Sequence, residues 1–156
     1  MREGPVIIGY DGSEVADQAI KDAAALLGPR PALVVTVWEA GVAYHTFPSV
    51  DIQAAPMDMR DAVLTDEAMY EGARIMAARG ADLAAQQGFT AESLTIADQG
   101  NVATTLVQIA QERDAAALVV GARGHGRLER FFLGSTSRQI LEHSPCPVIV
   151  VGPGER

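Results

Sequence analysis

Short apolar runs alternate along the chain with longer segments of helical periodicity. ALVVTVW, for example, is apolar at successive positions, which is typical of a parallel strand covered on both faces. The five runs that we interpret as strands are PVIIGYD, ALVVTVW, AESLTIAD, AAALVVGA and CPVIVVGP. Strands that alternate with helices predict a parallel sheet with right-handed crossovers and helices on both faces. The pattern therefore predicts a single α/β domain over residues 1–156, flavodoxin-like or Rossmann-like, with five parallel strands.

Five strands favour the flavodoxin-like strand order. In open sheets of this class, ligands bind beyond the carboxyl ends of the strands, where the strand order reverses. Asp11 follows the first predicted strand and Gly121 ends the fourth. The pattern predicts that these two residues meet at one crevice.

Local signals mark the ends of the predicted helices. Ser13 is a suitable N-cap for the first helix, which ends at Gly28-Pro29, and Asn101 caps a later one. Residues 41–60 show neither helical nor strand periodicity and contain two prolines, which favours an excursion or lid-like loop. A long helix is predicted from about Asp61 to Gln87. Its shared stripe consists of Met69, Gly72, Ile75, Met76 and Leu83.

Composition narrows the class of protein. With 48% hydrophobic residues the chain can form a core, and its net charge of −8 is opposite in sign to that of a general nucleic-acid binder. No apolar run approaches the roughly 20 residues of a membrane helix, and the N-terminus does not resemble a secretory signal. The single cysteine, Cys146, excludes an internal disulfide framework. These features favour a cytoplasmic protein that binds neither nucleic acid nor membrane.

The candidate chemistry lies in VVGARGHGRLERFFLGSTSRQIL, which starts at Val119. Glycines after a strand let backbone N–H groups approach an anion, and Gly134-Ser135 starts a helix whose N-terminus carries partial positive charge. Four arginines in the stretch add local positive charge. The segment therefore predicts a phosphate site, and the alternative is a mobile connection that binds no ligand.

Several known phosphate sites and a metal site do not match. A Walker loop needs a Gly-Lys-Ser/Thr end, and Lys21 is the only lysine. A dinucleotide fingerprint read from Gly124 would place Glu129 at its third glycine. Asp11 would repel the phosphate of FMN, and a receiver domain needs an acidic cluster with a distal lysine. No HExxH, CxxC or paired-histidine spacing indicates a metal site.

The spacing Gly121-x2-Gly124-x9-Gly134-Ser135 resembles the nucleotide-binding motif of the universal stress protein family, in its ATP-binding branch. The resemblance extends from the strand before Asp11 to the terminal SPCPVIVV. It implies that ATP, with Mg²⁺, is the ligand. Asp11 would then hold the ribose or the adenosine end, and Val37 would lie against adenine and offer backbone contacts. The residues implied around the phosphates are Gly121, Arg123, Gly124, Gly134, Ser135 and Thr136. Family members often carry Ser-His where this chain has Ala122-Arg123.

Simpler roles stay open for individual residues. Asp11 could cap the first helix or fix a turn, and Val37 could serve ordinary strand packing. His125 could touch a phosphate, act in proton transfer, or be an exposed loop residue. The arginines could form surface ion pairs of small energetic value.

The resemblance implies a regulatory homodimer that binds ATP and is not an enzyme. The apolar last strand, Val148 to Val151, would pair with its twin and so satisfy an exposed sheet edge. Two alternatives are a slow ATP hydrolase, in which Asp11 and His125 position metal or water, and a nucleotide-independent protein-interaction scaffold. AMP, ADP or a cyclic nucleotide are alternative ligands.

Overall fold

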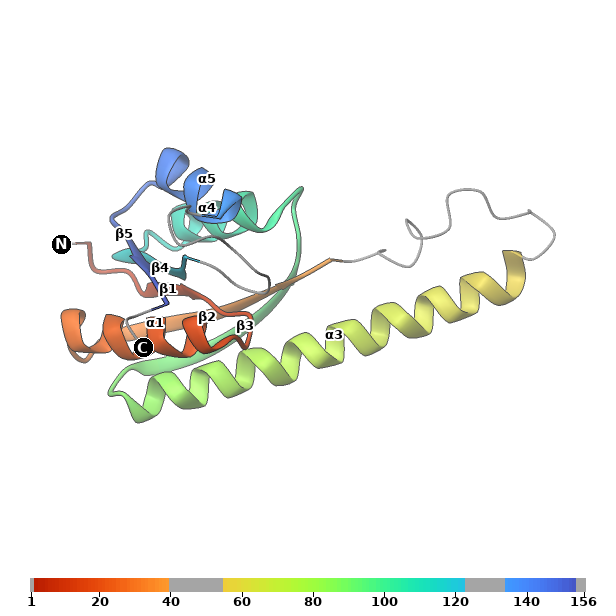
Figure 1. Cartoon of the computed structure of the whole chain (residues 1–156), viewed down its shortest axis with the longest axis horizontal. Helices are drawn as coiled ribbons and strands as arrows, with labels where there is room; N and C mark the ends of the chain where they lie inside the picture. The colour runs from red at the N-terminus through yellow and green to blue at the C-terminus, as the bar shows by residue number, and fades with distance from the viewer. Residues whose placement is uncertain (1, 40–54, 123–133, 154–156) are drawn as a thin grey trace.

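The protein forms one five-stranded parallel sheet covered by helices on both faces (Figure 1). The computed structural model describes residues 2–39, 55–122 and 134–153, and of residues 55–64 the backbone alone. The strands are β1 (Val6–Gly9), β2 (Pro31–Trp38), β3 (Thr90–Ala97), β4 (Ala117–Gly121) and β5 (Val148–Val151). All four strand pairs are parallel. The predicted fold class is therefore confirmed.

The strand order is β3-β2-β1-β4-β5, so the flavodoxin-like order expected from the strand count was wrong. Alternation of strands and helices fixes parallel crossovers, but it does not say to which side of the sheet each crossover leads. The chain runs outward from β1 through β2 to β3, then returns to the other side of β1 with β4. The order reverses between β1 and β4.

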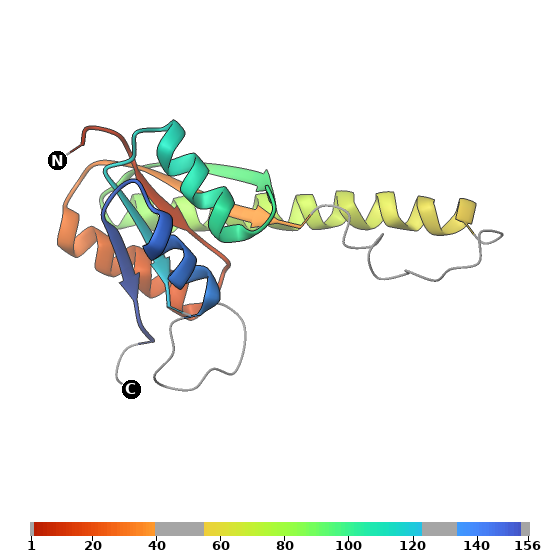
Figure 2. The same ribbon diagram turned by 90° about the horizontal axis from the view of Figure 1, so that it is seen from above.

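Each face of the sheet buries its own apolar cluster under two helices. Helices α1 (Glu14–Leu27) and α3 (Ala55–Gln86) cover one face, and α4 (Val102–Glu112) and α5 (Ser135–His143) cover the other (Figure 1 and Figure 2). Successive side chains of β1 point to opposite faces: Ile8 belongs to the cluster under α1 and α3, and Ile7 belongs to the cluster under α4 and α5. None of the helices in the described ranges is long and apolar enough to cross a membrane.

The predicted helix caps are confirmed. Ser13 Oγ accepts a hydrogen bond from the Ala16 N–H at 3.1 Å, and Asn101 Oδ1 accepts from the Thr104 N–H at 2.8 Å. Gly28 ends α1 with φ of 69°, and its N–H donates to the Ala24 carbonyl. These bonds satisfy backbone groups that a helix end leaves without an intrahelical partner.

The long helix α3 differs from the prediction at its start and on its buried face. It begins at Ala55, because a proline such as Pro56 is tolerated in the first turn, where its missing N–H is not needed. Residues 41–54 of the predicted excursion lie outside the described residues. Ile75 was expected on the packed stripe but is 58% exposed. The most buried positions are Ala73, Ala77, Gly80 and Ala84, and Met76 and Leu83 of the predicted stripe pack against the same core. Position 75 lies about 200° around the helix from Ala73, which turns it to the opposite side.

Candidate functional site

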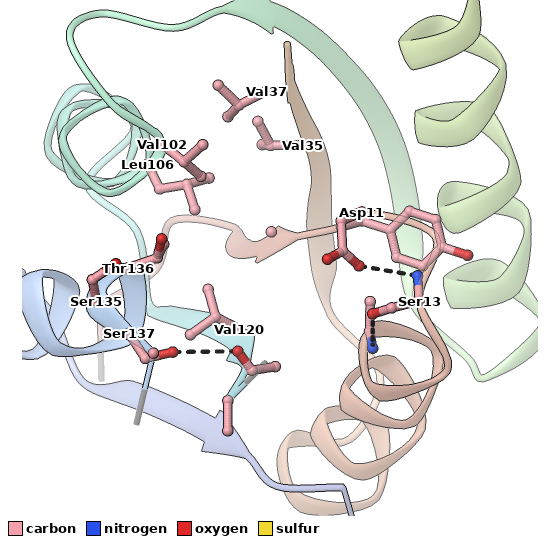
Figure 3. Close-up of a pocket in the computed structure, with 16 residues that line it drawn as sticks. Asp11, Ser13, Val35, Val37, Val102, Leu106, Val120, Ser135, Thr136 and Ser137 are labelled. Atoms are coloured by element: carbon pink, nitrogen blue, oxygen red, sulfur yellow. Dashed lines mark hydrogen bonds between the residues drawn. The ribbon is translucent and has the colours of Figure 1, made fainter. Parts of the chain in front are cut away.

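A cavity of about 420 Å³ opens at the carboxyl ends of β1 and β4, where the strand order reverses. The loop after β1 and the start of α5 face each other across it, and apolar side chains of β2 and α4 close a third side (Figure 3). This is the location in which open parallel sheets hold their ligands, and the volume lies in the range of small-molecule sites.

Six predicted site residues line this one cavity: Asp11, Val37, Gly121, Gly134, Ser135 and Thr136. They are distributed over more than 120 positions of the sequence, and the fold brings them together. The other three predicted site residues, Arg123, Gly124 and His125, lie outside the described residues. Their roles stay predictions.

Asp11 lies at the cavity and also fixes a turn. It lines the cavity, and its Oδ1 accepts a hydrogen bond from the Ser13 N–H at 3.0 Å (Figure 3). Gly12 between them adopts a φ of 79°, a left-handed conformation that favours glycine. The tight turn therefore orients the Asp11 carboxylate at the mouth of β1.

Val37 offers backbone groups on the cavity side of β2. The Trp38 carbonyl accepts from the Asp98 N–H, on the β3 side, while the Val35 carbonyl accepts from the Tyr10 N–H, on the β1 side. Backbone groups of successive strand residues point to opposite sides, so the N–H and C=O of Val37 point the same way as those of Val35. The pairing of β1 with β2 ends at Val35. The Val37 backbone groups thus project past the end of β1.

The N-terminus of α5 supplies the polar side of the cavity. Gly134 is its N-cap, makes no side-chain capping bond, and donates its N–H to the Ala122 carbonyl at 3.3 Å. A helix start of this kind carries about half a positive charge and N–H groups that have no intrahelical partner. The hydroxyl-bearing residues Ser135 and Thr136 follow at once. This arrangement suits an anion.

Several lining residues were not identified from the sequence as site residues. Val35, Val102 and Leu106 form the apolar wall, and in the sequence they had only the signal of ordinary core positions. Ser137 also lines the cavity; it is 2% exposed and its Oγ donates to the Gly121 carbonyl at 3.3 Å. The sequence could not predict this contact, because it depends on how α5 packs against the end of β4.

The sequence profile of the universal stress protein family matches residues 4–152 of the chain. The chain belongs to this family. A similar relative is the universal stress protein YxiE of Bacillus subtilis, 29% identical over 148 residues, which are 94% of this chain and 97% of YxiE.

Solved structures of universal stress proteins share the fold. Hypothetical protein MJ0577 superimposes with a TM-score of 0.77 at 18% identity, and the match covers all of both chains. A complex of the Archaeoglobus fulgidus universal stress protein with dAMP gives 0.64 at 20% identity, covering 97% of this chain and 99% of that one. A universal stress protein in complex with cAMP gives 0.59 at 23% identity, covering 95% and 96%. At sequence identities this low, the structural similarity shows only that these proteins share their fold with this chain.

The carboxylates available to a metal ion are few in the lining of this universal stress protein cavity. Asp11 is the one acidic residue among the described residues that line it. Within the described ranges no group of three or more histidine, cysteine or acidic side chains is arranged to hold a metal ion.

Proposed function

We propose that this universal stress protein binds ATP in the cavity between β1 and β4 and acts as a regulatory module. The observation that carries the proposal is the two-sided chemistry of the cavity. Its apolar wall with the Val37 backbone lies on one side, and the uncapped start of α5 with Ser135 and Thr136 lies on another. A base needs the first kind of surface and phosphates need the second.

The β2 side suits adenine in particular. The Val37 N–H is a donor and its C=O is an acceptor, and both project into the space beyond β1. Adenine presents an acceptor at N1 beside a donor at N6, which complements that pair. Guanine presents a donor at N1 beside an acceptor at O6, which is the reverse order, so it cannot make both bonds in the orientation that ribose at Asp11 and phosphates at α5 impose on the nucleotide. Val35, Val102 and Leu106 provide apolar surface for the faces of the ring.

The other contacts follow the course of the nucleotide across the cavity. Asp11 would accept hydrogen bonds from the ribose hydroxyls, and Gly134, Ser135 and Thr136 would hold the phosphates. In the same proposal Gly121 borders the phosphates, and Arg123, Gly124 and His125 complete the cradle. Mg²⁺ would bind to the phosphates, with Asp11 as the carboxylate that the described part of the lining offers.

The complexes of other universal stress proteins with dAMP and cAMP support an adenine nucleotide as the class of ligand. AMP, ADP and cyclic nucleotides remain competitors of ATP within this proposal. We favour regulation over catalysis because Asp11 is the one acidic residue among the described residues of the lining and the proposal assigns it to the ribose. Slow hydrolysis is tested by single-turnover assays with the His125→Ala variant.

Calorimetry of the purified chain with ATP and Mg²⁺ tests the proposal, with GTP as the competitor. We expect saturable ATP binding and at least about tenfold weaker binding of GTP, the effect of one mismatched hydrogen-bonding edge. Bound adenine nucleotide is also expected when freshly purified protein is denatured and chromatographed. No bound nucleotide and no heat of ATP binding would disprove the proposal.

The Gly134→Glu variant tests the phosphate end. Gly134 has φ −59° and ψ 158°, a conformation open to any residue, so the variant tests charge and space rather than backbone strain. A carboxylate at the start of α5 would repel the phosphates, and we expect ATP affinity to be lost while the unfolding transition stays cooperative. Gly72→Glu is the matched control, because a Cβ at Gly72 would meet nothing within 4 Å. Equal ATP affinity in both variants would show that α5 does not hold the phosphates.

We also propose that the chain is a homodimer through β5. This strand forms one edge of the sheet, and its residues Val148, Ile149 and Val150 are only partly buried. Pairing with a second copy would satisfy the backbone groups of that edge and cover its apolar side chains. The cytoplasm is the compartment that we expect, from the single cysteine.

A further inference from the structure

The first glycine of the phosphate motif packs against a helix on the far side of the sheet from α5. A Cβ at Gly121 would lie 2.8 Å from Cγ1 of Val15, closer than real side chains approach. Val15 is the second residue of α1, the helix that follows the Asp11 turn. The space that a side chain at Gly121 would need is therefore occupied by a methyl group of Val15.

Val15 cannot give way cheaply. A valine inside a helix has one strongly preferred χ1 rotamer, so turning the methyl group aside is unfavourable. The backbone carbon and the Cβ of Val15 are both 3.5 Å from the Cβ position, which is ordinary contact distance. The steric conflict thus lies in the γ-methyl group alone.

Gly121 is also tied to the opposite layer. Its carbonyl accepts from Ser137 Oγ of α5 at 3.3 Å. One residue at the end of β4 therefore touches α1 on one face of the sheet and α5 on the other.

The Asp11 side of the cavity is anchored separately, on β2. The Tyr10 N–H donates to the Val35 carbonyl at 2.9 Å, and Thr36 Oγ1 donates to the Tyr10 carbonyl at 3.0 Å. A change in the Val15 contact would therefore separate α1 and the Asp11 turn from β4 and α5, while the turn stays with β2.

We propose that Val15 is a positioning residue for nucleotide binding. Its methyl group, seated against Gly121, sets the separation between the Asp11 turn and the phosphate cradle at α5. The inference rests on the proposed ATP site for its ligand, and it assigns Gly121 a role in spacing the two halves of that site.

A double-variant experiment tests this role by calorimetry with ATP and with adenosine. Gly121→Ala should weaken ATP binding about tenfold, the scale of an overpacked contact. Adenosine needs only the Asp11 and Val37 side, so its affinity should change less than about threefold. Adding Val15→Ala removes the γ-methyl groups and should restore ATP affinity to within about threefold of the original chain.

Matched variants separate this contact from general effects. Val107→Ala removes the same atoms from another half-buried helical valine, on α4, and should not rescue Gly121→Ala. Gly72→Ala meets nothing within 4 Å and should leave ATP affinity unchanged. Rescue by Val107→Ala, no rescue by Val15→Ala, or equal loss of ATP and adenosine affinity would overturn the inference.

Urea unfolding of the same variants gives a readout that needs no ligand. Gly121→Ala should lower the unfolding midpoint, and Val15→Ala should recover part of that loss, which is a non-additive effect of two residues in contact. If Gly121→Ala does not fold, cooperative folding of the double variant is the rescue, and its failure to fold contradicts the proposal. If the original chain binds no ATP, the proposed function fails, while additive unfolding effects would refute the Val15 contact itself.

Discussion

Tyr10 connects the nucleotide cavity to the helix layer on the opposite face of the sheet. Tyr10 is among the residues that line the cavity, yet it is only 3% exposed, and a Cβ on Gly80 of α3 would come within 2.8 Å of its ring. Its hydroxyl donates to Asp17 Oδ1 at 2.5 Å. Burial first, and then the bond to the Asp17 carboxylate, raise the pKa of Tyr10 to about 12.

The raised pKa predicts a pH window in which Tyr10 contributes to stability. An unfolded tyrosine has a pKa of about 10. Below that pH both states are protonated and the contribution is fully present; as the pH rises from about 10 to about 12 the unfolded state loses its proton first. The unfolding free energy should therefore fall through this window, and fall less steeply in Tyr10→Phe. Urea unfolding at stepped pH measures both slopes, and equal slopes would contradict the prediction.

At the scale of elements, local signals predicted the structure well where local chemistry decides it. Ser13 and Asn101 cap their helices as their sequence context indicated, because the cap bond reaches only three residues along the chain. The start of α3 was missed, because a first-turn proline is also a loop signal. Its packed face was predicted only in part: Met76 and Leu83 pack against the core, but the buried positions hold small residues that allow close approach, and the large apolar Ile75 is exposed.

Two glycines of α3 should therefore respond to alanine with opposite signs. Gly72→Ala meets nothing within 4 Å and should stabilise the protein by about 0.5–1 kcal/mol, the gain in helix propensity. Gly80→Ala would bring a Cβ to 2.8 Å from the Tyr10 ring and from Val34 Cγ1. Overpacking of about 1–3 kcal/mol exceeds the propensity gain, so this variant should be destabilised. Urea unfolding of the two variants checks the signs; stabilisation by Gly80→Ala would show that α3 can move away.

At the scale of the whole molecule, the strand order decides what sequence patterns could not. Asp11 and Gly121 line one cavity as predicted, although the expected strand order was wrong, because β1 and β4 are neighbours in the observed sheet. Their distance along the chain gave no information about the apolar wall or about Ser137, which depend on how α4 and α5 pack. The order also leaves two edge strands, β3 and β5, of which the homodimer proposal uses β5.

The hydrogen-bond pattern of β5 selects the variant that tests the dimer. The carbonyls of Pro147 and Val151 accept from β4, so by alternation Ile149 also faces β4 and the N–H of Val150 points outward. Val150→Pro removes an outward donor and leaves the pairing of β4 with β5 intact, as edge strands tolerate. We expect a dimer for the original chain and a monomer for Val150→Pro in sedimentation velocity.

The other edge supplies the control. The Thr90 N–H donates to the carbonyl of Arg30, just before β2, and the Asp98 N–H donates to that of Trp38 in β2. By alternation, the N–H of the exposed Ser93 on β3 points away from the sheet. Ser93→Pro makes the same change on an edge that the proposed dimer does not use, and it should stay dimeric. A dimer that persists in Val150→Pro, or is lost equally in both variants, would show that β5 is not the interface.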